Sequence, residues 1–375
     1  MKTRLFVAAL LSALVSAFPA ASQFYAQDNL VSNGFTTTTA PTDLNLVNAW
    51  GLVAGPTTPW WVADNGSAKS TLYNAMGVAI VPISPVDLLG HPPTGVVFNI
   101  AGSGFVLPGT SSSARFIFST EDGTIIGWSL ATGAVVAANR SASGAVYKGL
   151  AIATATIGTT TGTFLYATDF HNGVVDVYDS SFTLVSPPGG FVDRHLPERY
   201  APFGIQAIGS AIYVTFAKQD KARHDDVAGK GRGFVDKFDA AGNMLQRVAS
   251  HGTLNSPWGI ALAPANFGTF SGDLLIGNFG DGRITAFAPS TKHPDKEFES
   301  AGQMRALDCS TLSIDGLWSL QFGKGNAASG PTNTLFFTAG PNSESDGLFG
   351  NLTAAAAPNC PPKHDDDDGS GGDDD

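Results

Sequence analysis

Charged side chains are scarce in this chain. Asp, Glu, Lys and Arg make up 14% of its 375 residues, against roughly 25% in typical soluble domains. The formal net charge is −11, but residues 361–375 hold seven Asp and one Lys, a net of −6, which leaves −5 for the rest. Because no basic excess remains to attract a polyanion, nucleic acid is excluded as an expected partner.

Cysteine and the standard catalytic motifs are also nearly missing. Cys309 and Cys360 are the only two cysteines. In an oxidising compartment they can form a disulfide, and two unpaired thiols are the alternative. The chain has no Gly-x-Ser-x-Gly elbow, His-Glu-x-x-His pair, Walker loop, Cys-x-x-Cys or complete EF-hand loop, so no familiar enzyme class follows from a motif.

Long helical periodicity is absent from the mature region, whereas short apolar segments recur around tight turns. Asn, Asp and Gly favour such turns because they tolerate positive φ. The mean spacing of the turns is about 56 residues, which is typical of a propeller blade. The six turns are Asn65-Gly66, Asp122-Gly123, Asn172-Gly173, Gly231-Arg232-Gly233, Asp281-Gly282 and Asp346-Gly347. The sequence therefore predicts an all-β, six-bladed propeller of four-stranded antiparallel blades.

A second anchor, usually an aromatic residue followed by Gly, precedes each turn. It reads Trp50-Gly51 in unit one, Phe203-Gly204 in unit four and Trp258-Gly259 in unit five. We interpret the ring as a wedge between blades. Unit two has only a weak version, residues 114–118. An apolar segment left over at the front, Phe24 to Ser32, is expected to pair with the last blade and close the ring.

The two ends of the chain define the domain boundaries. Residues 1–22 have a basic start, an apolar run and a small-residue cleavage site, so they predict a signal peptide. A membrane anchor is the alternative, but the run is shorter than the ~20 residues needed to span. Residues 23–355 are expected to form the propeller and 356–375 a disordered, Asp-rich tail.

Secretion follows from the predicted signal peptide. The protein is expected to be extracellular or periplasmic, monomeric, and without a transmembrane segment after cleavage. The sequons at Asn65, Asn139 and Asn351 would carry glycans only in a eukaryotic source.

Long phrases throughout the chain resemble one family. They cover about residues 27 to 352 and include Leu46-Val47-Asn48-Ala49-Trp50-Gly51-Leu52, Val146-Tyr147-Lys148-Gly149-Leu150, His224-Asp225-Asp226-Val227-Ala228-Gly229 and Gly277-Asn278-Phe279-Gly280-Asp281-Gly282. The family consists of secreted, mostly bacterial, uncharacterised proteins related to NHL-repeat propellers. Some relatives carry a C-terminal sorting segment, where this chain has the Asp-rich tail. The resemblance implies a fold and a compartment, but no activity.

Polar residues recur after the second strand of several units. The positions are Asp64, Glu121, Asp169 and Asn278. They could form a ring of ligands, but a short acid at this place commonly accepts hydrogen bonds from the backbone of the turn that follows it. We interpret them as local caps.

Unit four departs from the repeat with a polar insertion between residues 218 and 233. Binding groups often lie on such loops over a rigid scaffold, although a solvated excursion is the alternative. In a propeller this loop shares a face with the loop of unit three and the links into units four and five. The predicted binding residues on this rim are His171, Asp220, His224, Asp225, Asp226 and His251.

Two functions remain open. The first is an extracellular binding or scaffolding module for an unidentified ligand or protein. The second is a metal-dependent hydrolase or lyase of the propeller lactonase kind, using the rim of units three to five. His171, His224, His251 and Asp225 are candidate ligands for a divalent metal, because imidazole and carboxylate groups coordinate such ions.

Overall fold

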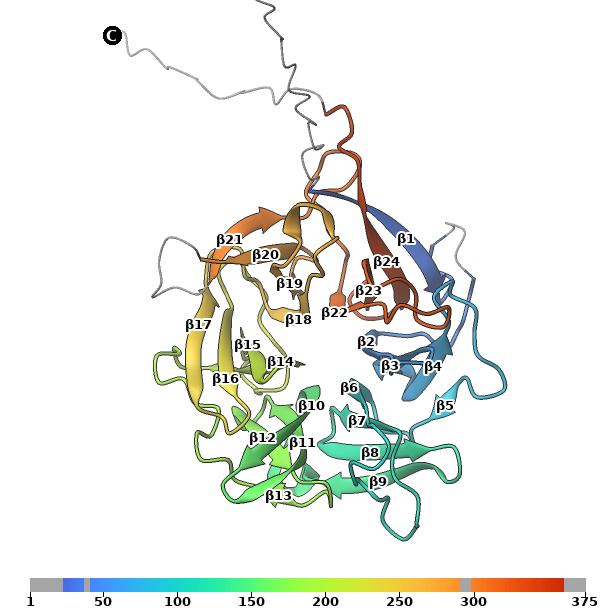
Figure 1. Cartoon of the computed structure of the whole chain (residues 1–375), viewed down its shortest axis with the longest axis vertical. Coiled ribbons are helices and arrows are strands. Elements are labelled where there is room, and N and C mark those ends of the chain that lie inside the picture. Colours follow the sequence, from blue (N-terminus) through green and yellow to red (C-terminus); the bar gives the residue numbers. More distant parts are fainter. Residues whose placement is uncertain (1–22, 37–40, 291–297, 361–375) are drawn as a thin grey trace, which may run out of the picture.

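Six four-stranded antiparallel sheets surround a central axis in the computed structural model (Figure 1), which describes residues 23–36, 41–290 and 298–360. The predicted six-bladed propeller is confirmed. Blade one contains β2(Ala49–Val53), β3(Trp60–Asp64), β4(Lys69–Tyr73) and β5(Val86–Asp87); blade two contains β6(Pro93–Phe98), β7(Phe116–Thr120), β8(Thr124–Ser129) and β9(Gly133–Asn139). Blade three contains β10(Tyr147–Ile157), β11(Thr160–Asp169), β12(Val174–Tyr178) and β13(Leu184–Val185); blade four contains β14(Tyr200–Ile208), β15(Ala211–Lys218), β16(Phe234–Asp239) and β17(Met244–Ser250). Blade five contains β18(Pro257–Leu262), β19(Leu274–Asn278), β20(Ile284–Pro289) and β21(Phe298–Gln303); blade six contains β22(Leu317–Phe322), β23(Thr334–Ala339), β24(Leu348–Ala355) and β1(Phe24–Ser32).

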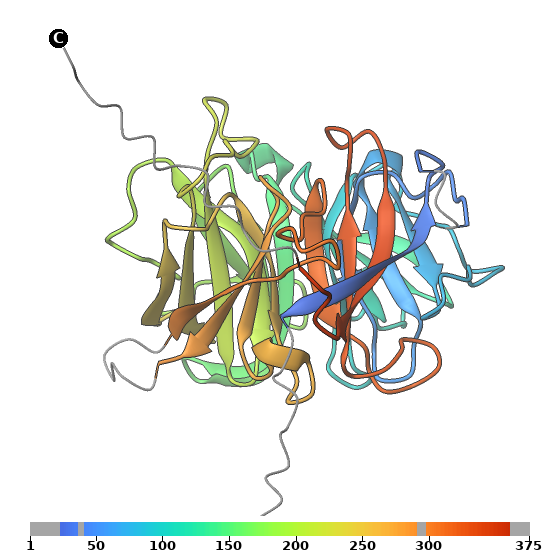
Figure 2. The same ribbon diagram turned by 90° about the horizontal axis from the view of Figure 1, so that it is seen from above.

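Blade six combines strands from both ends of the chain. β1 pairs antiparallel with β24 from Phe24–Ala355 to Ser32–Leu348 (Figure 2). The buried Tyr25 hydroxyl also donates to the carbonyl of Phe267, 3.0 Å away, near blade five. The predicted closing strand is therefore confirmed, and the ring is tied by main-chain hydrogen bonds rather than left with an open edge.

Close approach between neighbouring inner strands explains the Gly of each anchor. A Cβ on Gly204 would lie 2.1 Å from the carbonyl oxygen of Trp258, and one on Gly259 would lie 2.6 Å from that of Trp318. The wedge interpretation of the rings is wrong, because Trp258 and Trp318 lie together over the axis instead. The unit-two anchor was also misplaced: the inner strand is β6, and its glycine is Gly95.

The tight turns use glycine in two ways. Gly123, Gly173, Gly231 and Gly282 have positive φ, as expected for these turns. In blade one, however, Asn65–Ser67 forms a 3-10 turn, and the left-handed residue is Ala68. Gly347 of blade six also lacks positive φ, and a Cβ there would meet the Leu46 carbonyl oxygen at 2.0 Å. At these two turns glycine is needed for space and not for its φ angle.

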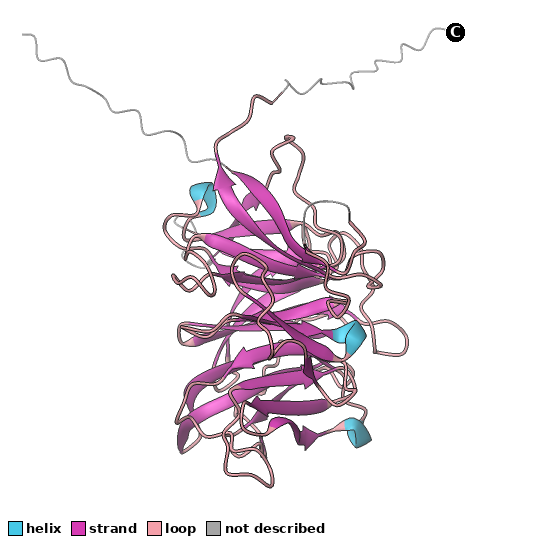
Figure 3. Cartoon of the chain, turned by 90° about the vertical axis from the view of Figure 1, so that its right-hand side faces the viewer, coloured by secondary structure: helices cyan, strands magenta, loops and turns pink. Residues whose placement is uncertain are grey.

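The strands run between two sets of loops (Figure 3). We call the upper face the one that carries the loops between second and third strands together with the links from blade to blade. The lower face carries the remaining loops. Within the described ranges the helical elements are three short 3-10 turns, and no helix there is long and apolar enough to cross a membrane. The predicted signal peptide and residues 361–375 of the tail lie outside the described residues.

Candidate ligand site on the propeller axis

Aromatic rings close the axis just beneath the upper face. Trp318 stacks on Trp50, with ring centroids 3.7 Å apart, and on Phe279, 4.0 Å apart. Trp258 packs edge-on against both tryptophans. The indole nitrogens of Trp50 and Trp318 both donate to Asn48 Oδ1, at 2.8 and 3.1 Å. Because the indole N–H groups are satisfied, this floor is a fixed apolar platform.

Lys148 takes the place in blade three that an aromatic ring takes in most other blades. Its side chain is only 2% exposed. The ammonium lies 5.0 Å from the centre of the Trp50 ring and donates to a carboxylate oxygen of Glu121 and to Asp225 Oδ1, the latter at 3.2 Å. A buried charge is tolerated only when it is paired and hydrogen-bonded, so Lys148 organises the carboxylates around it.

Glu121 faces the axis because it lies one residue beyond the capping position. In blade two that position is Thr120, whose hydroxyl accepts from the Thr124 N–H at 2.9 Å. Glu121 Oε2 instead accepts from Asn65 Nδ2, 3.1 Å away on the neighbouring blade. Glu121 is the first residue after β7 ends at Thr120, and its carboxylate bonds Asn65 of blade one and Lys148 of blade three.

The cap interpretation holds for the other three recurrent polar residues. Asp64 accepts from the Thr71 N–H at 2.6 Å, Asp169 from the Val146 N–H at 3.2 Å, and Asn278 from the Asn255 N–H at 3.1 Å. Thr71 lies in β4, and Val146 and Asn255 lie in the links that enter blades three and five. Of the three side chains, Asp169 also accepts from the turn that follows it, through the Asn172 N–H at 3.1 Å. Glu121 therefore differs from Asp64, Asp169 and Asn278, although the sequence predicted the same capping role for all four.

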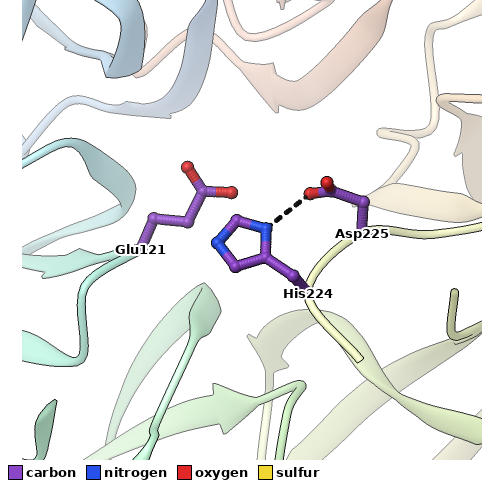
Figure 4. Close-up of side chains that lie close together, drawn as sticks. All are labelled: Glu121, His224 and Asp225. Atoms are coloured by element: carbon purple, nitrogen blue, oxygen red, sulfur yellow. Dashed lines mark hydrogen bonds and ion pairs between the residues drawn. The ribbon is translucent and has the colours of Figure 1, made fainter. Parts of the chain in front are cut away.

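The polar insertion of blade four reaches the same point on the axis. Asp220 Oδ1 accepts from the N–H groups of His224 and Asp225, at 2.9 and 3.4 Å, and so holds the turn that presents them. His224 Nδ1 lies 2.9 Å from Asp225 Oδ1 (Figure 4). One ligand atom each from Glu121, His224 and Asp225 lies within 4.8 Å of the others. The insertion therefore brings His224 and Asp225 next to Glu121 of blade two.

The electrostatics of the site are dominated by acids. Burial opposes ionisation of Asp225, but Lys148 and His224 together hold the pKa of this carboxyl below its usual range. Burial raises the pKa of Glu344, which accepts from Asn48 at 3.1 Å, and that of Asp226. Both carboxyls are electrostatically coupled to Lys148. Glu121 and Asp225 are both bonded to the one Lys148 ammonium, so this pair of carboxylates retains an excess of negative charge.

Two of the predicted site residues lie outside this cluster. His171 packs near Gly144, where an added Cβ would be 3.5 Å from the imidazole. His251 Nδ1 lies 2.9 Å from the Gly231 carbonyl oxygen, and its ring packs on Phe234 with centroids 4.7 Å apart. Of the predicted set, His224, Asp225 and Asp226 gather beside Lys148, and Asp220 supports the loop.

Sequence reasoning missed Asn48, Lys148 and Glu344 as members of the site, and it read Glu121 as a cap. The sequence did contain a signal for Lys148. It is a cation at the position before the anchor glycine, where most other blades have an aromatic residue. Glu121 carried no signal that sets it apart, because it precedes Asp122-Gly123 directly, just as the cap Asp64 precedes Asn65-Gly66. No sequence pattern pointed to Glu344, because it lies in an irregular loop with positive φ at three successive residues.

The cluster can do chemistry of two kinds. Its negative excess over an aromatic floor can bind a positively charged group, through ion pairs and cation–π contact. Its imidazole and carboxylates can also ligate a divalent metal. The Lys148 ammonium is already hydrogen-bonded to two of the three candidate ligands, so a metal would compete with it.

Comparisons with known proteins identify relatives and confirm the fold. "Uncharacterized protein R648" of Acanthamoeba polyphaga mimivirus is 30% identical over 338 residues, which are 86% of this chain and 78% of that protein. "Uncharacterized protein L690" of the same virus is 30% identical over 329 residues, 83% of this chain and 81% of that protein. No family model matches the chain.

Solved structures are similar at the level of the fold alone. The soluble aldose sugar dehydrogenase of Escherichia coli has a TM-score of 0.54 and 13% identity, covering 88% of this chain and 100% of that one. A protein of unknown function from Bacteroides thetaiotaomicron has a TM-score of 0.53 and 10% identity, covering 88% and 76%. The propeller part of the family resemblance is supported, but the relatives found by sequence are viral and not bacterial.

Proposed function

We propose that this chain, which belongs to the family of the mimivirus proteins R648 and L690, is an extracellular binding propeller whose axial site takes a positively charged group of its ligand. The observation that carries the proposal is the buried Lys148 ammonium, which is bonded to the carboxylates of both Glu121 and Asp225. One ammonium balances only one of these two carboxylates, so the site retains attraction for a second cation.

The exposed side of the cluster is suited to a ligand from solution. The Asp225 side chain is 67% exposed and that of His224 is 48% exposed, whereas Glu121 is 16% exposed and Lys148 2%. A ligand amine would meet Asp225 first and then Glu121. Amines are the favoured ligand class because an ammonium group matches carboxylates in charge-assisted hydrogen bonds.

An extracellular location is supported by two features. Residues 1–22 have the composition of a signal peptide. Cys309 and Cys360 are joined as a disulfide in the structure, and such bonds persist mainly in oxidising compartments. Glycosylation at two of the three sequons is disfavoured, because Asn351 is 8% exposed and Asn65 donates to Glu121 within the site.

A second candidate is a metal-dependent hydrolase or lyase. The convergence of Glu121, His224 and Asp225 favours it, since three protein ligands leave positions for water or substrate. Against it stands Lys148, whose ammonium would have to leave the two carboxylates before an ion could bind them both.

A titration of the purified protein distinguishes these candidates. Spermidine, Ca²⁺ and Mn²⁺ are added separately, and the fluorescence of the tryptophans beneath the site is recorded. We expect saturable binding of spermidine that weakens with salt, because the outer carboxylate is exposed to screening. Asp225→Asn and Glu121→Gln should each weaken this binding about tenfold, as expected for loss of a charged hydrogen bond.

The matched control is Asp28→Asn, which removes an exposed carboxylate from the outer strand β1. It should leave spermidine binding unchanged. A saturable response to Ca²⁺ or Mn²⁺ with none to spermidine would select the metal-dependent candidate. Equal spermidine binding by wild type, Asp225→Asn and Glu121→Gln would show that the axial site does not bind spermidine, and would contradict the proposal.

A further inference from the structure

A second cavity lies on the lower face between blades one and two, away from the axial site. Its volume is about 590 Å³, within the range of small-molecule pockets. Loops of both blades border it: Pro59 comes from the loop before β3, Ile83 from the loop after β4, and Leu130 from the loop after β8. None of these loops takes part in the axial cluster.

The cavity exists because the outer strand of blade one is short. β5 pairs only with Lys69 and Ser70 of β4, so the second half of β4 is not covered by a strand. A loop folds over this edge instead: the Ile80 N–H donates to the Leu72 carbonyl oxygen at 2.9 Å. The loop satisfies the backbone of β4 but leaves an open space between its own apolar side chains and blade two.

Stacked aromatic rings form the floor. Trp61 lies 3.9 Å from Phe116 and 4.6 Å from Trp128, centroid to centroid. Trp61 points to blade two because it alternates with Trp60, whose ring packs on Phe336 of blade six. The floor is rigid, since the three rings are no more than 8% exposed.

The rim combines exposed apolar side chains with one cation. Leu130 lines the cavity and is 78% exposed, and Val81 in the covering loop is 75% exposed. Arg115 also lines the cavity. Its guanidinium lies 4.3 Å over the Phe98 ring and makes one long hydrogen bond, 3.5 Å, to the Asn99 carbonyl oxygen.

The charge of Arg115 has no carboxylate partner among the residues that the structure describes. A guanidinium has five N–H donors in a planar fork that matches a carboxylate. An apolar space with such a fork at its edge is complementary to a molecule with an apolar body and one carboxylate. We propose that this cavity binds an apolar monocarboxylic acid, with its hydrocarbon part on Trp61, Phe116 and Trp128 and its carboxylate on Arg115.

Calorimetric titration with two matched probes tests the proposal. Decanoate and 1-decanol share the same chain and differ in the carboxylate. Wild-type protein should bind decanoate at least tenfold more tightly than decanol, because only decanoate pairs with Arg115. In Arg115→Gln this preference should disappear, while decanol binding stays the same.

Two further variants make the outcome decisive. Ala131→Trp places a large ring in an exposed turn that lines the cavity, so it should weaken both probes at least tenfold without touching the core. Arg283→Gln, an exposed arginine on the upper face, should change neither. Unchanged melting curves show that the variants are folded. Absence of saturable decanoate binding to wild type, or a decanoate preference that survives in Arg115→Gln, would overturn the proposal.

Discussion

Asp64 and Glu121 show how one position in a strand decides between a structural and a functional carboxylate. Asp64 is the last residue of β3 and accepts from the backbone of the next strand. Burial raises the pKa of this carboxyl well above 3.8. Blade five has the neutral Asn278 at the same place, which indicates that the capping role needs the oxygen and not the charge.

The first prediction concerns Asp64→Asn. Between pH 3.8 and the raised pKa, folded protein holds the proton that the unfolded chain has released, so stability falls as pH rises through this window. The variant has no such charge to bury. We expect its melting temperature to exceed that of wild type by about 2 °C at pH 8, with the difference shrinking as the pH is lowered.

Thermal melts at pH 8 and pH 5 check this expectation. Asp28→Asn, which changes an exposed acid, serves as control and should show no pH-dependent gain. A variant that melts lower than wild type at both pH values would mean that the Asp64 charge itself stabilises the cap.

The sequence was sufficient to predict the six-bladed repeat, but it predicted only some of the residues of the axial site. Turn pairs and anchor glycines follow from local chemistry, so six blades and the closing strand could be predicted. The assembly of the site depends on which residue of each blade faces the axis. Lys148, Glu121 and Glu344 come from blades three, two and six, and no local pattern links them. The blade-four insertion was identified because its polarity is visible in the sequence itself.

At the scale of the strand, the anchor glycines set how tightly the inner strands pack around the axis. The second prediction is that Gly204→Ala lowers the free energy of unfolding by about 1–3 kcal/mol, the usual cost of overpacking. The added Cβ would stand 2.1 Å from the Trp258 carbonyl oxygen, and backbone atoms cannot move aside easily.

Gly162→Ala is the matched control, because Gly162 lies in strand β11 and an added Cβ there meets nothing within 4 Å. Denaturant unfolding of both variants makes the comparison. Equal stability of Gly204→Ala and Gly162→Ala would contradict the packing role assigned to the anchor glycine.

At the scale of the whole molecule, two contacts fix the C-terminal segment of the propeller. β1 pairs with β24, and Cys360, beyond β24, is joined to Cys309 in the link before blade six. The third prediction is that Cys309 and Cys360 are oxidised in the mature protein. Alkylation of unfolded, unreduced protein should add no mass, whereas alkylation after reduction should add two groups. Two added groups without reduction would exclude the disulfide.

The upper face as a whole is organised by one internal cation. Lys148 holds Glu121 and Asp225 together above the tryptophan floor, and Asp225 is the most exposed of these three side chains. Removing the ammonium should therefore open the cluster to a metal ion, because the Glu121 and Asp225 carboxylates then repel each other.

Thermal melting of Lys148→Met with and without millimolar Ca²⁺ tests this claim most directly. We expect the variant to melt below wild type in the presence of a chelator and to regain stability when Ca²⁺ is added, since binding to the folded state stabilises it. Wild type should respond to neither chelator nor Ca²⁺. A wild type that loses stability on chelation, together with a Lys148→Met variant that is indifferent to Ca²⁺, would contradict the account.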